Sequence, residues 1–370
     1  MTKTYEVCHV DFDTVLFRAA KSCQTDFIKV KHKTVKWEKR FDGVSKFYGL
    51  GKSKNKGWIG EENTKREKAG KPLISVDDFV IEECSELRDD HDIILEDAMD
   101  QIDYAVGRIK KHSEAEDYKL YIGDGGNFRY DLANILPYKG NRKDKPLLFL
   151  ELKEKFVEKY KNKVVLIKDQ EVDDALGIIG YNNYKQFLKT KKYKDILSFV
   201  DKDLKMILSP SFNYDKVEDG ISIPTPEEAA RYFCSQLLSG DKTTDNIQGL
   251  PNFSHEFQQK YNTGKTRGIG KATANSLVEG KSIKEMFSLV IESYKSYYGE
   301  EKKEFISLNF ILGLLRSKKE NDAIFVNVGR NIKMSHLIAC HETNNAINIV
   351  NLFLWKVVHL HESDLTSWRE

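Results

Sequence analysis

Four short segments with the alternating or apolar pattern of β-strands each end at, or a few residues before, an acidic side chain. Helical patterns lie between several of them, which favours an α/β fold with a mainly parallel sheet. Ligands of such sheets bind beyond the carboxyl ends of the strands, so folding would gather the acidic side chains at one edge. The segments are 4–10, 118–122, 164–167 and 196–200, and the acidic residues beyond them are Asp11, Asp124, Glu171 and Asp201.

Acidic residues recur in clusters along the chain, and the number of clusters predicts a metal site. Carboxylates a few ångströms apart raise one another's pKa, so a group of this size needs a counter-charge. Mg²⁺ or Mn²⁺ suits oxygen ligands, and two ions about 3.5–4 Å apart can clamp the attacking and leaving oxygens of a phosphodiester displacement. We therefore expect two such ions. The candidate ligands are Asp11, Asp13, Asp124, Glu171, Asp173, Asp174, Asp201, Asp203, Asp241 and Asp245.

The composition is that of a soluble protein. Of the 370 residues, 31% are charged, the mean hydropathy is -0.53, and no apolar run approaches the ~20 residues that span a bilayer. The N-terminal residues lack the apolar core of a signal peptide. We therefore expect a cytoplasmic protein, in the host cytoplasm if the chain is viral, with no membrane partner. The five cysteines lack CxxC spacing and are expected to be reduced.

The net charge of +2 is the sum over acidic clusters and basic segments that are separate in the sequence. If the carboxylates converge on one pocket, the remaining surface is more basic than the total suggests. A metal-dependent nuclease needs this distribution of charge, because its substrate is a polyanion.

A basic segment, NFRYDLANILPYKGNRKDKP, precedes a helix expected over residues 147–160. Beside a metal site, this segment would suit a scissile phosphate, with Lys139 adding positive charge and Tyr138 a face for an unpaired base. Arg129 and Arg142 add further charge. We expect Lys139 and Arg142 to take part in catalysis. The alternative interpretation is a solvated turn with no role.

At Gly268 the sequence GIGKATA has the form of a helix-hairpin-helix phosphate binder. Gly268 and Gly270 would let the backbone approach a phosphate closely, and a helix beginning near Lys271 would offer N–H groups and a positive dipole end. Such loops contact the nucleic-acid backbone, not its bases. A short glycine loop alone is a weak signal, but GDKTTDNIQGLP precedes this one.

Residues 26–56 are rich in lysine and aromatic side chains. Two interpretations stay open for this segment. It forms a protruding, solvated β-hairpin, or it tracks a nucleic-acid strand by charge and by stacking of aromatic side chains on bases. Residues 63–71 are expected to form a mobile loop, and residues 94–109 an amphipathic core helix. The aromatic side chains in question are Trp37, Phe41, Phe47, Tyr48 and Trp58.

Taken in order, these motifs resemble the 5′-nuclease superfamily, which includes flap endonucleases, the 5′-nuclease domains of bacterial DNA polymerases and bacteriophage 5′→3′ exonucleases. The resemblance covers residues 5–277. It rests on VDFDTVLFR, FRYDLANILPYKGNR, EVDDALG, DKDL, and GDKTTDNIQG followed by GIGKATA. The chain departs from the family pattern where three residues separate Asp241 from Asp245, and where residues 252–267 are inserted.

The resemblance implies a PIN-like domain over residues 1–222, with a mainly parallel sheet flanked by helices. This domain would carry a basic insertion at about 26–71 and a helical arch at about 137–162. A mainly α helix-hairpin-helix region with a C-terminal extension would follow over residues 223–370, and would hold a K⁺ ion. The DNA-binding residues implied are Arg18, Arg129, Tyr138, Lys139, Arg142, Gly268, Gly270 and Lys271.

The implied activity is that of a Mg²⁺-dependent 5′ nuclease. It would hydrolyse phosphodiester bonds near the 5′ ends of branched, flapped or nicked duplex DNA, and of RNA in RNA–DNA hybrids, in replication, primer removal or recombination. We expect a monomer, with a single-strand-binding or other replisome protein as a further partner. Two alternatives are a catalytically inactive, structure-specific DNA-binding protein and a PIN-type ribonuclease.

Overall fold

The computed structural model describes residues 4–50, 56–127, 130, 144–240, 249–264, 268–298, 323–328 and 335–340. Contacts divide the chain into two units. The first, which we call the sheet unit, comprises residues 1–13, 108–142 and 163–370. The second, the insertion unit, comprises residues 14–107 and 143–162. Each unit is described by itself.

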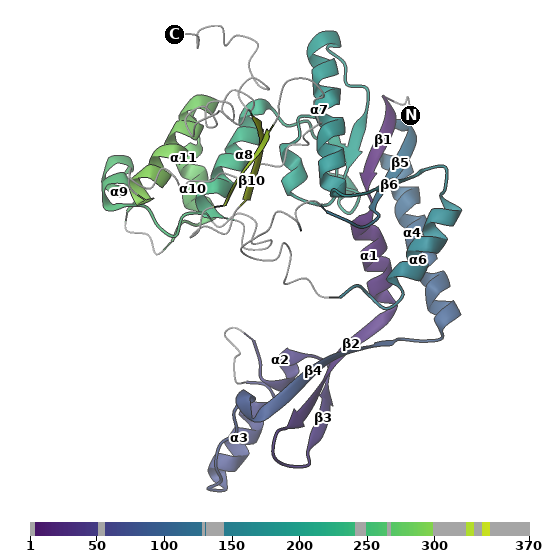
Figure 1. The fold of residues 1–370 in the computed structure, drawn as a ribbon, viewed down its shortest axis with the longest axis vertical. Helices are drawn as coiled ribbons and strands as arrows, with labels where there is room; N and C mark the ends of the chain where they lie inside the picture. The colour runs from purple at the N-terminus through teal and green to yellow at the C-terminus, as the bar shows by residue number, and fades with distance from the viewer. Residues whose placement is uncertain are drawn as a thin grey trace. The chain divides into compact units, whose positions relative to one another are not determined.

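Five parallel strands form the sheet of the sheet unit, in the order β6-β5-β1-β7-β8. Figure 1 shows β1, β5 and β6 together near the N-terminus. The α/β expectation with a mainly parallel sheet is confirmed, and four of the strands lie where the sequence predicts them. The strands are β1 (Tyr5–Asp11), β5 (Ala115–Gly123), β6 (Val164–Ile167), β7 (Ile196–Ser198) and β8 (Ser211–Phe212).

The strand order reverses at β1. The next two strands of the sheet, β5 and β6, lie on one side of β1, whereas β7 and β8 lie on the other. Where the order of a parallel sheet reverses, the connections leave in opposite directions and open a crevice beyond the carboxyl ends of the central strands. In this chain the central strands are β1, which ends on Asp11, and β7, which is followed by Asp201.

Helix α7 (Val172–Thr190) packs on this sheet through its apolar face. Val172 and Leu176 are buried against Tyr121 of β5 and Leu197 of β7. Gly180 has no room for a side chain, because a Cβ there would lie 2.1 Å from Ile207 Cγ2. The close packing holds the N-terminus of α7 at the carboxyl end of β6.

Four helices of the sheet unit share a second hydrophobic core. They are α8 (Pro226–Ser239), α9 (His255–Tyr261), α10 (Lys271–Val278) and α11 (Ile283–Tyr298). Thr225 caps α8 by accepting a hydrogen bond from the Glu228 N–H (3.2 Å), as expected for a helix that opens on Thr-Pro. The prediction of helices after residue 220 is confirmed as far as Tyr298. Beyond it, the described residues form two antiparallel strands that the sequence did not predict, β9 (Ala323–Val328) and β10 (Ser335–Cys340).

In the insertion unit, three helices carry apolar faces. They are α1 (Asp13–Ser22), α4 (His91–His112) and α6 (Phe149–Lys159), with Asp13 of α1 and residues 108–112 of α4 belonging to the sheet unit. The helices predicted over 94–109 and 147–160 are confirmed as α4 and α6. The Asp103 carboxylate of α4 accepts hydrogen bonds from Lys159 (2.5 Å) and Tyr160 (2.7 Å) at the end of α6. His91, at the start of α4, contacts Glu151 of α6 at 2.8 Å.

Residues 24–87 of the insertion unit form a small folded module, which we call the inserted module. Its antiparallel sheet has the order β3-β2-β4. A hairpin was one of the two interpretations of residues 26–56, and β2 and β3 form it, but the third strand was not predicted. The loop expected at residues 63–71 is wrong for its first part, because residues 63–68 belong to a helix. The elements are β2 (Gln24–His32), β3 (Glu38–Phe41), α2 (Val44–Phe47), α3 (Trp58–Lys68), η2 (Val76–Asp78) and β4 (Phe79–Leu87).

The aromatic side chains of the inserted module pack on one another. Phe47 is fully buried, with ring centroids 5.2 Å from Phe41 and 5.3 Å from Phe79. Trp37 stacks on Trp58 at 4.8 Å. Phe41 and Phe47 are buried and cannot also stack on nucleic-acid bases, so a base-stacking role is wrong for these two, whereas Trp37, Tyr48 and Trp58 are half-buried and pack against the core. Phe41 and Phe47 form part of the hydrophobic core of the module.

Candidate functional site

Asp11 is the last residue of β1, and its side chain is buried at the carboxyl edge of the parallel sheet. Burial, followed by the negative charge of Asp13, raises the pKa of this carboxyl to about 7, against the lowering effect of a hydrogen bond from the Asp13 N–H (3.2 Å). The charges of Asp201 and Glu171 act in the same direction. Four predicted ligands therefore lie close enough for their charges to interact.

Asp13 connects the ends of β1 and β5. Its Oδ1 accepts a hydrogen bond from the Gly123 N–H at 3.0 Å, and a Cβ at Gly123 would lie only 3.3 Å from the other carboxylate oxygen. The next residue, Asp124, donates its N–H to the Ile167 carbonyl (2.7 Å) at the end of β6. Its carboxylate lies 3.6 Å from Lys168 Nζ. Asp13 and Asp124 thus both stand at the edge that holds Asp11.

Two loops of the sheet unit meet closely beside Asp124. Gly126 has φ +70°, and a Cβ there would lie 2.4 Å from Asp169 Oδ1. Asp169 itself adopts a positive φ of 58° and donates its N–H to the Gly125 carbonyl (3.2 Å). Glycine is required at 126 for both reasons. This contact draws the loop after β5 against the loop after β6, which leads to Glu171.

The EVDD motif opens helix α7. Glu171 is the residue before the first turn, and its N–H donates to Asp174 Oδ2 at 3.1 Å. Through this bond Asp174, which is buried, caps the helix, whereas Asp173 is half-buried. Acidic side chains in the first turn are also stabilised by the positive end of the helix dipole. The motif thus has a structural role in addition to any ligand role.

Asp201 follows β7 by three residues and is half-buried. Asp203 begins the 3-10 helix η3 (Asp203–Met206). The side chain of Asp203 and the whole of Asp241 and Asp245 lie outside the described residues. Within the part that the structure describes, no three His, Cys, Asp or Glu side chains are placed so that they could hold a metal ion. The structure therefore gathers Asp11, Asp13, Glu171 and Asp201 without a completed ligand set.

The predicted DNA-binding residues are described in part. Arg18 is exposed on α1. Gly268 has φ +138°, Gly270 precedes the first turn of α10, and Lys271 is the first residue of that helix, with an exposed side chain. The glycine loop thus leads into a helix N-terminus, as the motif predicts. Arg129, Tyr138, Lys139 and Arg142 lie outside the described residues.

Sequence reasoning missed a buried polar network under Asp11. His9 Nδ1 and Tyr121 Oη are 2.8 Å apart, and His9 Nε2 lies 3.7 Å from Asp195 Oδ2. Burial, followed by the charge of Asp195, raises the pKa of Tyr121 to about 12, so its hydroxyl stays protonated. Tyr121 pairs with Asp11 across the strands. The only sequence signal was the position of His9 two residues before Asp11, on the same face of β1.

Comparison with models of known protein families and with curated proteins found no match to this chain. Over the described ranges, no helix combines the length and apolar character needed to cross a membrane.

Proposed function

We propose that this chain is a divalent-metal-dependent 5′ nuclease of the PIN-like type. The observation that carries the proposal is the convergence of Asp11, Asp13, Glu171 and Asp201 at the carboxyl edge of a parallel sheet. They come from the ends of β1, β6 and β7, and the strand order reverses between β1 and β7. That is where α/β folds bind ligands.

The chemistry of these carboxylates suits hard divalent cations. A carboxyl whose pKa is raised to about 7 by burial and by neighbouring negative charges is costly to ionise alone, and a cation removes that cost. Oxygen-only donors favour Mg²⁺ or Mn²⁺. Asp11, Glu171 and Asp201 would hold the ions, with Asp13 and Asp124 at the margin. The cations would acidify the attacking water and neutralise charge on the phosphate.

The other residues of the chain would bind and orient the substrate. The glycine loop before α10 would hold the backbone of the duplex through N–H groups at the helix N-terminus. Lys139 and Arg142 would stabilise charge on the phosphate in the transition state. Tyr138 would stack on the base of the unpaired terminal nucleotide. A K⁺ ion at the glycine loop and a replisome partner remain part of the same proposal.

A panel of 5′-labelled substrates tests the proposal. Flapped, nicked and RNA–DNA hybrid duplexes, together with single-stranded RNA, are incubated with the protein in Mg²⁺ or in EDTA. We expect cleavage near the 5′ end of the duplex substrates in Mg²⁺ alone. Binding without cleavage would indicate an inactive DNA-binding protein, and cleavage restricted to single-stranded RNA would indicate a ribonuclease. Either outcome would overturn the assignment.

A further inference from the structure

The inserted module is electrically asymmetric. Between residues 29 and 56 the sequence holds ten Lys or Arg residues and two acidic residues, whereas between residues 57 and 87 it holds four basic and eight acidic residues. The first stretch supplies the C-terminal part of β2 and all of β3 and α2, and the second supplies α3 and β4. Because the strand order is β3-β2-β4, the basic strand β3 and the acidic strand β4 form opposite edges of the sheet.

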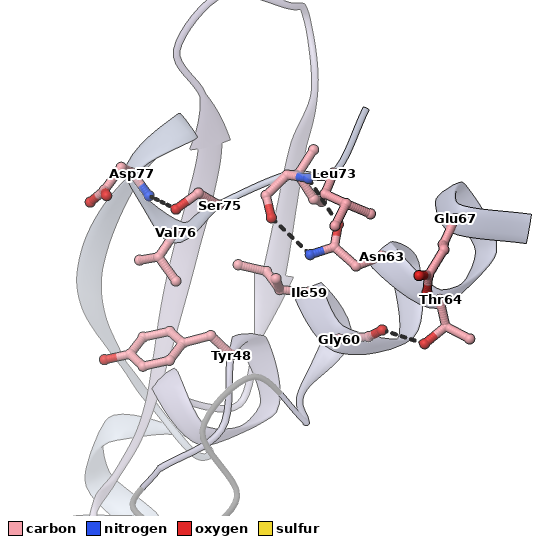
Figure 2. Close-up of a pocket in the computed structure, with 11 residues that line it drawn as sticks. Tyr48, Ile59, Gly60, Asn63, Thr64, Glu67, Leu73, Ser75, Val76 and Asp77 are labelled. Carbon is pink, nitrogen blue, oxygen red and sulfur yellow. Dashed lines mark hydrogen bonds between the residues drawn. The ribbon is translucent and has the colours of Figure 1, made fainter. Parts of the chain in front are cut away.

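The acidic side of the module carries exposed carboxylates. Glu82 and Glu83 are exposed on β4. A pocket of about 650 Å³ lies between α3 and the segment that leads to η2, and its charged lining groups are Glu67 and Asp77 (Figure 2). The side-chain amide of Asn63 closes one wall by bonding both the N–H and the carbonyl of Ile74 at 2.8 Å. This side would repel a polyanion.

The basic stretch carries exposed lysines in the β2–β3 turn, on β3, on α2 and just before α3, and we call five of them the lysine surface. Within the described residues, no carboxylate lies within salt-bridge distance of any of them, whereas Lys31 and Arg40 are paired with Glu38 and Glu86. Lys33 and Lys36 lie in the turn between β2 and β3. The members of the lysine surface are Lys33, Lys36, Lys39, Lys46 and Lys56.

The aromatic core positions part of the lysine surface. Lys39 Nζ lies 5.2 Å from the ring centroid of Phe41 and 6.0 Å from that of Trp58. Its stem therefore packs on apolar surface while the ammonium group stays in water. A Cβ at Gly57 would lie 2.7 Å from the Phe47 backbone, so the chain beside Lys56 is held against the end of α2. The lysines are thus carried by a folded scaffold.

The chemistry of this surface fits a phosphate backbone better than a protein. Lysine is depleted from the cores of protein–protein interfaces, where aromatic side chains and arginine are enriched. Here the aromatic side chains pack in or against the module core, and the positively charged groups without a carboxylate partner are lysines, since Arg40 is paired with Glu86. Lysines neutralise phosphates as point charges without reading bases.

We propose that the lysine surface of the inserted module binds the sugar–phosphate backbone of a nucleic acid, as a contact additional to the glycine loop. The binding is independent of base sequence and electrostatic. The acidic opposite edge orients the module, because only the β3 side attracts a polyanion. This inference extends the proposed nuclease function by adding a second region that grips the substrate.

Two triple variants of the full chain provide the test. In the first, Lys33→Gln, Lys36→Gln and Lys46→Gln remove three charges from the lysine surface. In the second, Lys65→Gln, Lys68→Gln and Lys71→Gln remove three charges from exposed positions at the end of α3 on the same module. Both have the same net charge, so a general loss of positive charge affects both equally. Fluorescence anisotropy with a labelled flap duplex in EDTA, between 50 and 200 mM KCl, gives Kd and its salt dependence.

We expect the first triple variant to weaken binding by at least about tenfold at low salt and to lower the salt slope by about 2–3, at ~0.9 per phosphate contact. The α3 variant should bind within about twofold of the unchanged protein. Equal effects in the two variants, or no effect in either, would overturn the inference. Loss of binding to a polyglutamate peptide in the first variant, with nucleic-acid binding unchanged, would assign an acidic protein partner instead.

The proposed function can fail separately. If the unchanged chain cleaves the flap in Mg²⁺ while both triple variants bind it equally well, only the lysine-surface inference falls. If the unchanged chain neither binds nor cleaves any duplex of the panel, the nuclease proposal falls as well.

Discussion

Charged side chains are arranged differently at the carboxyl edge of the parallel sheet and in the inserted module. The edge gathers like charges: Asp11 is buried, and its pKa is raised by Asp13, Asp201 and Glu171. The module keeps its charges exposed and separates them by sign, while its aromatic side chains form an ordinary core. A fold gains nothing in stability from buried like charges. The charges of the edge are therefore unfavourable for the stability of the metal-free fold, which is consistent with the metal site that we propose there, whereas the packed side chains of the module stabilise it.

The largest effect is expected when one carboxylate is removed from the edge of the sheet. Asp201→Asn should lower Mg²⁺-dependent cleavage by more than about 10³-fold, because several kcal/mol of charge stabilisation at the phosphate would be lost. Single-turnover kinetics on a labelled flap measures the change. Asp219→Asn, an exposed aspartate of η4 (Val217–Asp219), is the matched control and should leave the rate within about twofold. A near-normal rate for Asp201→Asn would refute the site.

Loss of an aromatic side chain from its core should destabilise the inserted module. Phe47→Ala removes a fully buried ring that contacts Phe41 and Phe79, so it should cost about 3–5 kcal/mol of local stability. Hydrogen exchange followed by mass spectrometry should show faster exchange over residues 24–87 and unchanged protection in β1 and β5. Val35→Ala, at an exposed turn position, should change nothing measurable. Equal loss of protection in the parallel sheet would show that the module is not a separate folding element.

At the sheet edge, removal of the Asp11 carboxylate should stabilise the metal-free protein, whereas removal of Phe47 should destabilise the module. The folded-state pKa of Asp11 is raised to about 7 from an ordinary 3.8, so the metal-free protein favours the protonated form. Its contribution to stability is complete below about pH 4 and is lost as the pH rises toward 7 and above. Asp11→Asn should therefore stabilise the metal-free protein at pH 8, by up to ~4 kcal/mol at 1.36 kcal/mol per pKa unit, and little at pH 4.

Thermal unfolding in EDTA at several pH values measures this difference. Adding Mg²⁺ at pH 8 should raise the Tm of the unchanged protein and have a smaller effect on Asp11→Asn, because binding to the folded state stabilises it. A difference in stability that does not vary with pH would contradict the electrostatic explanation.

The smallest effect is expected at the glycine loop. Lys271→Ala removes one exposed charge at the start of α10 and should lower the salt slope of duplex binding by about 0.9, the value for one phosphate contact. Lys281→Ala, between α10 and α11, is the control and should leave the slope unchanged. An unaltered slope for Lys271→Ala would leave the loop without a phosphate role.

Sequence patterns located the strands of the parallel sheet well and the inserted module poorly. The strands β1, β5, β6 and β7 have local apolar patterns that end in acidic residues, so they could be predicted without knowing their neighbours. Helix α3 has only one buried residue, Ile59, and hence no apolar periodicity to reveal it. The helix is held in place by the side chain of Asn63, which forms hydrogen bonds with the backbone of Ile74, eleven residues away. Such a contact is invisible in a local pattern.

The role of the aromatic side chains was also decided by contacts. Trp37, Phe41, Phe47 and Trp58 alternate with lysines, a pattern shared by base-stacking surfaces and by small cores. Strand β4, residues 79–87, pairs with β2, and this pairing places Phe79 against Phe47 and Trp58. In the resulting core Phe41 and Phe47 are buried, while the neighbouring lysines stay exposed. The two interpretations could be separated only by this non-local pairing.

By itself, the amino-acid sequence determined the α/β class, the positions of Asp11, Asp124, Glu171 and Asp201 after strands, and the glycine loop before a helix. These follow from local periodicity and from residue chemistry, which do not depend on distant contacts. Only the tertiary structure decided that the strand order reverses at β1, that four of the acidic residues interact, and that the module separates basic from acidic edges. Those properties arise from pairing of segments far apart in the chain, and side-chain pKa values respond to that proximity.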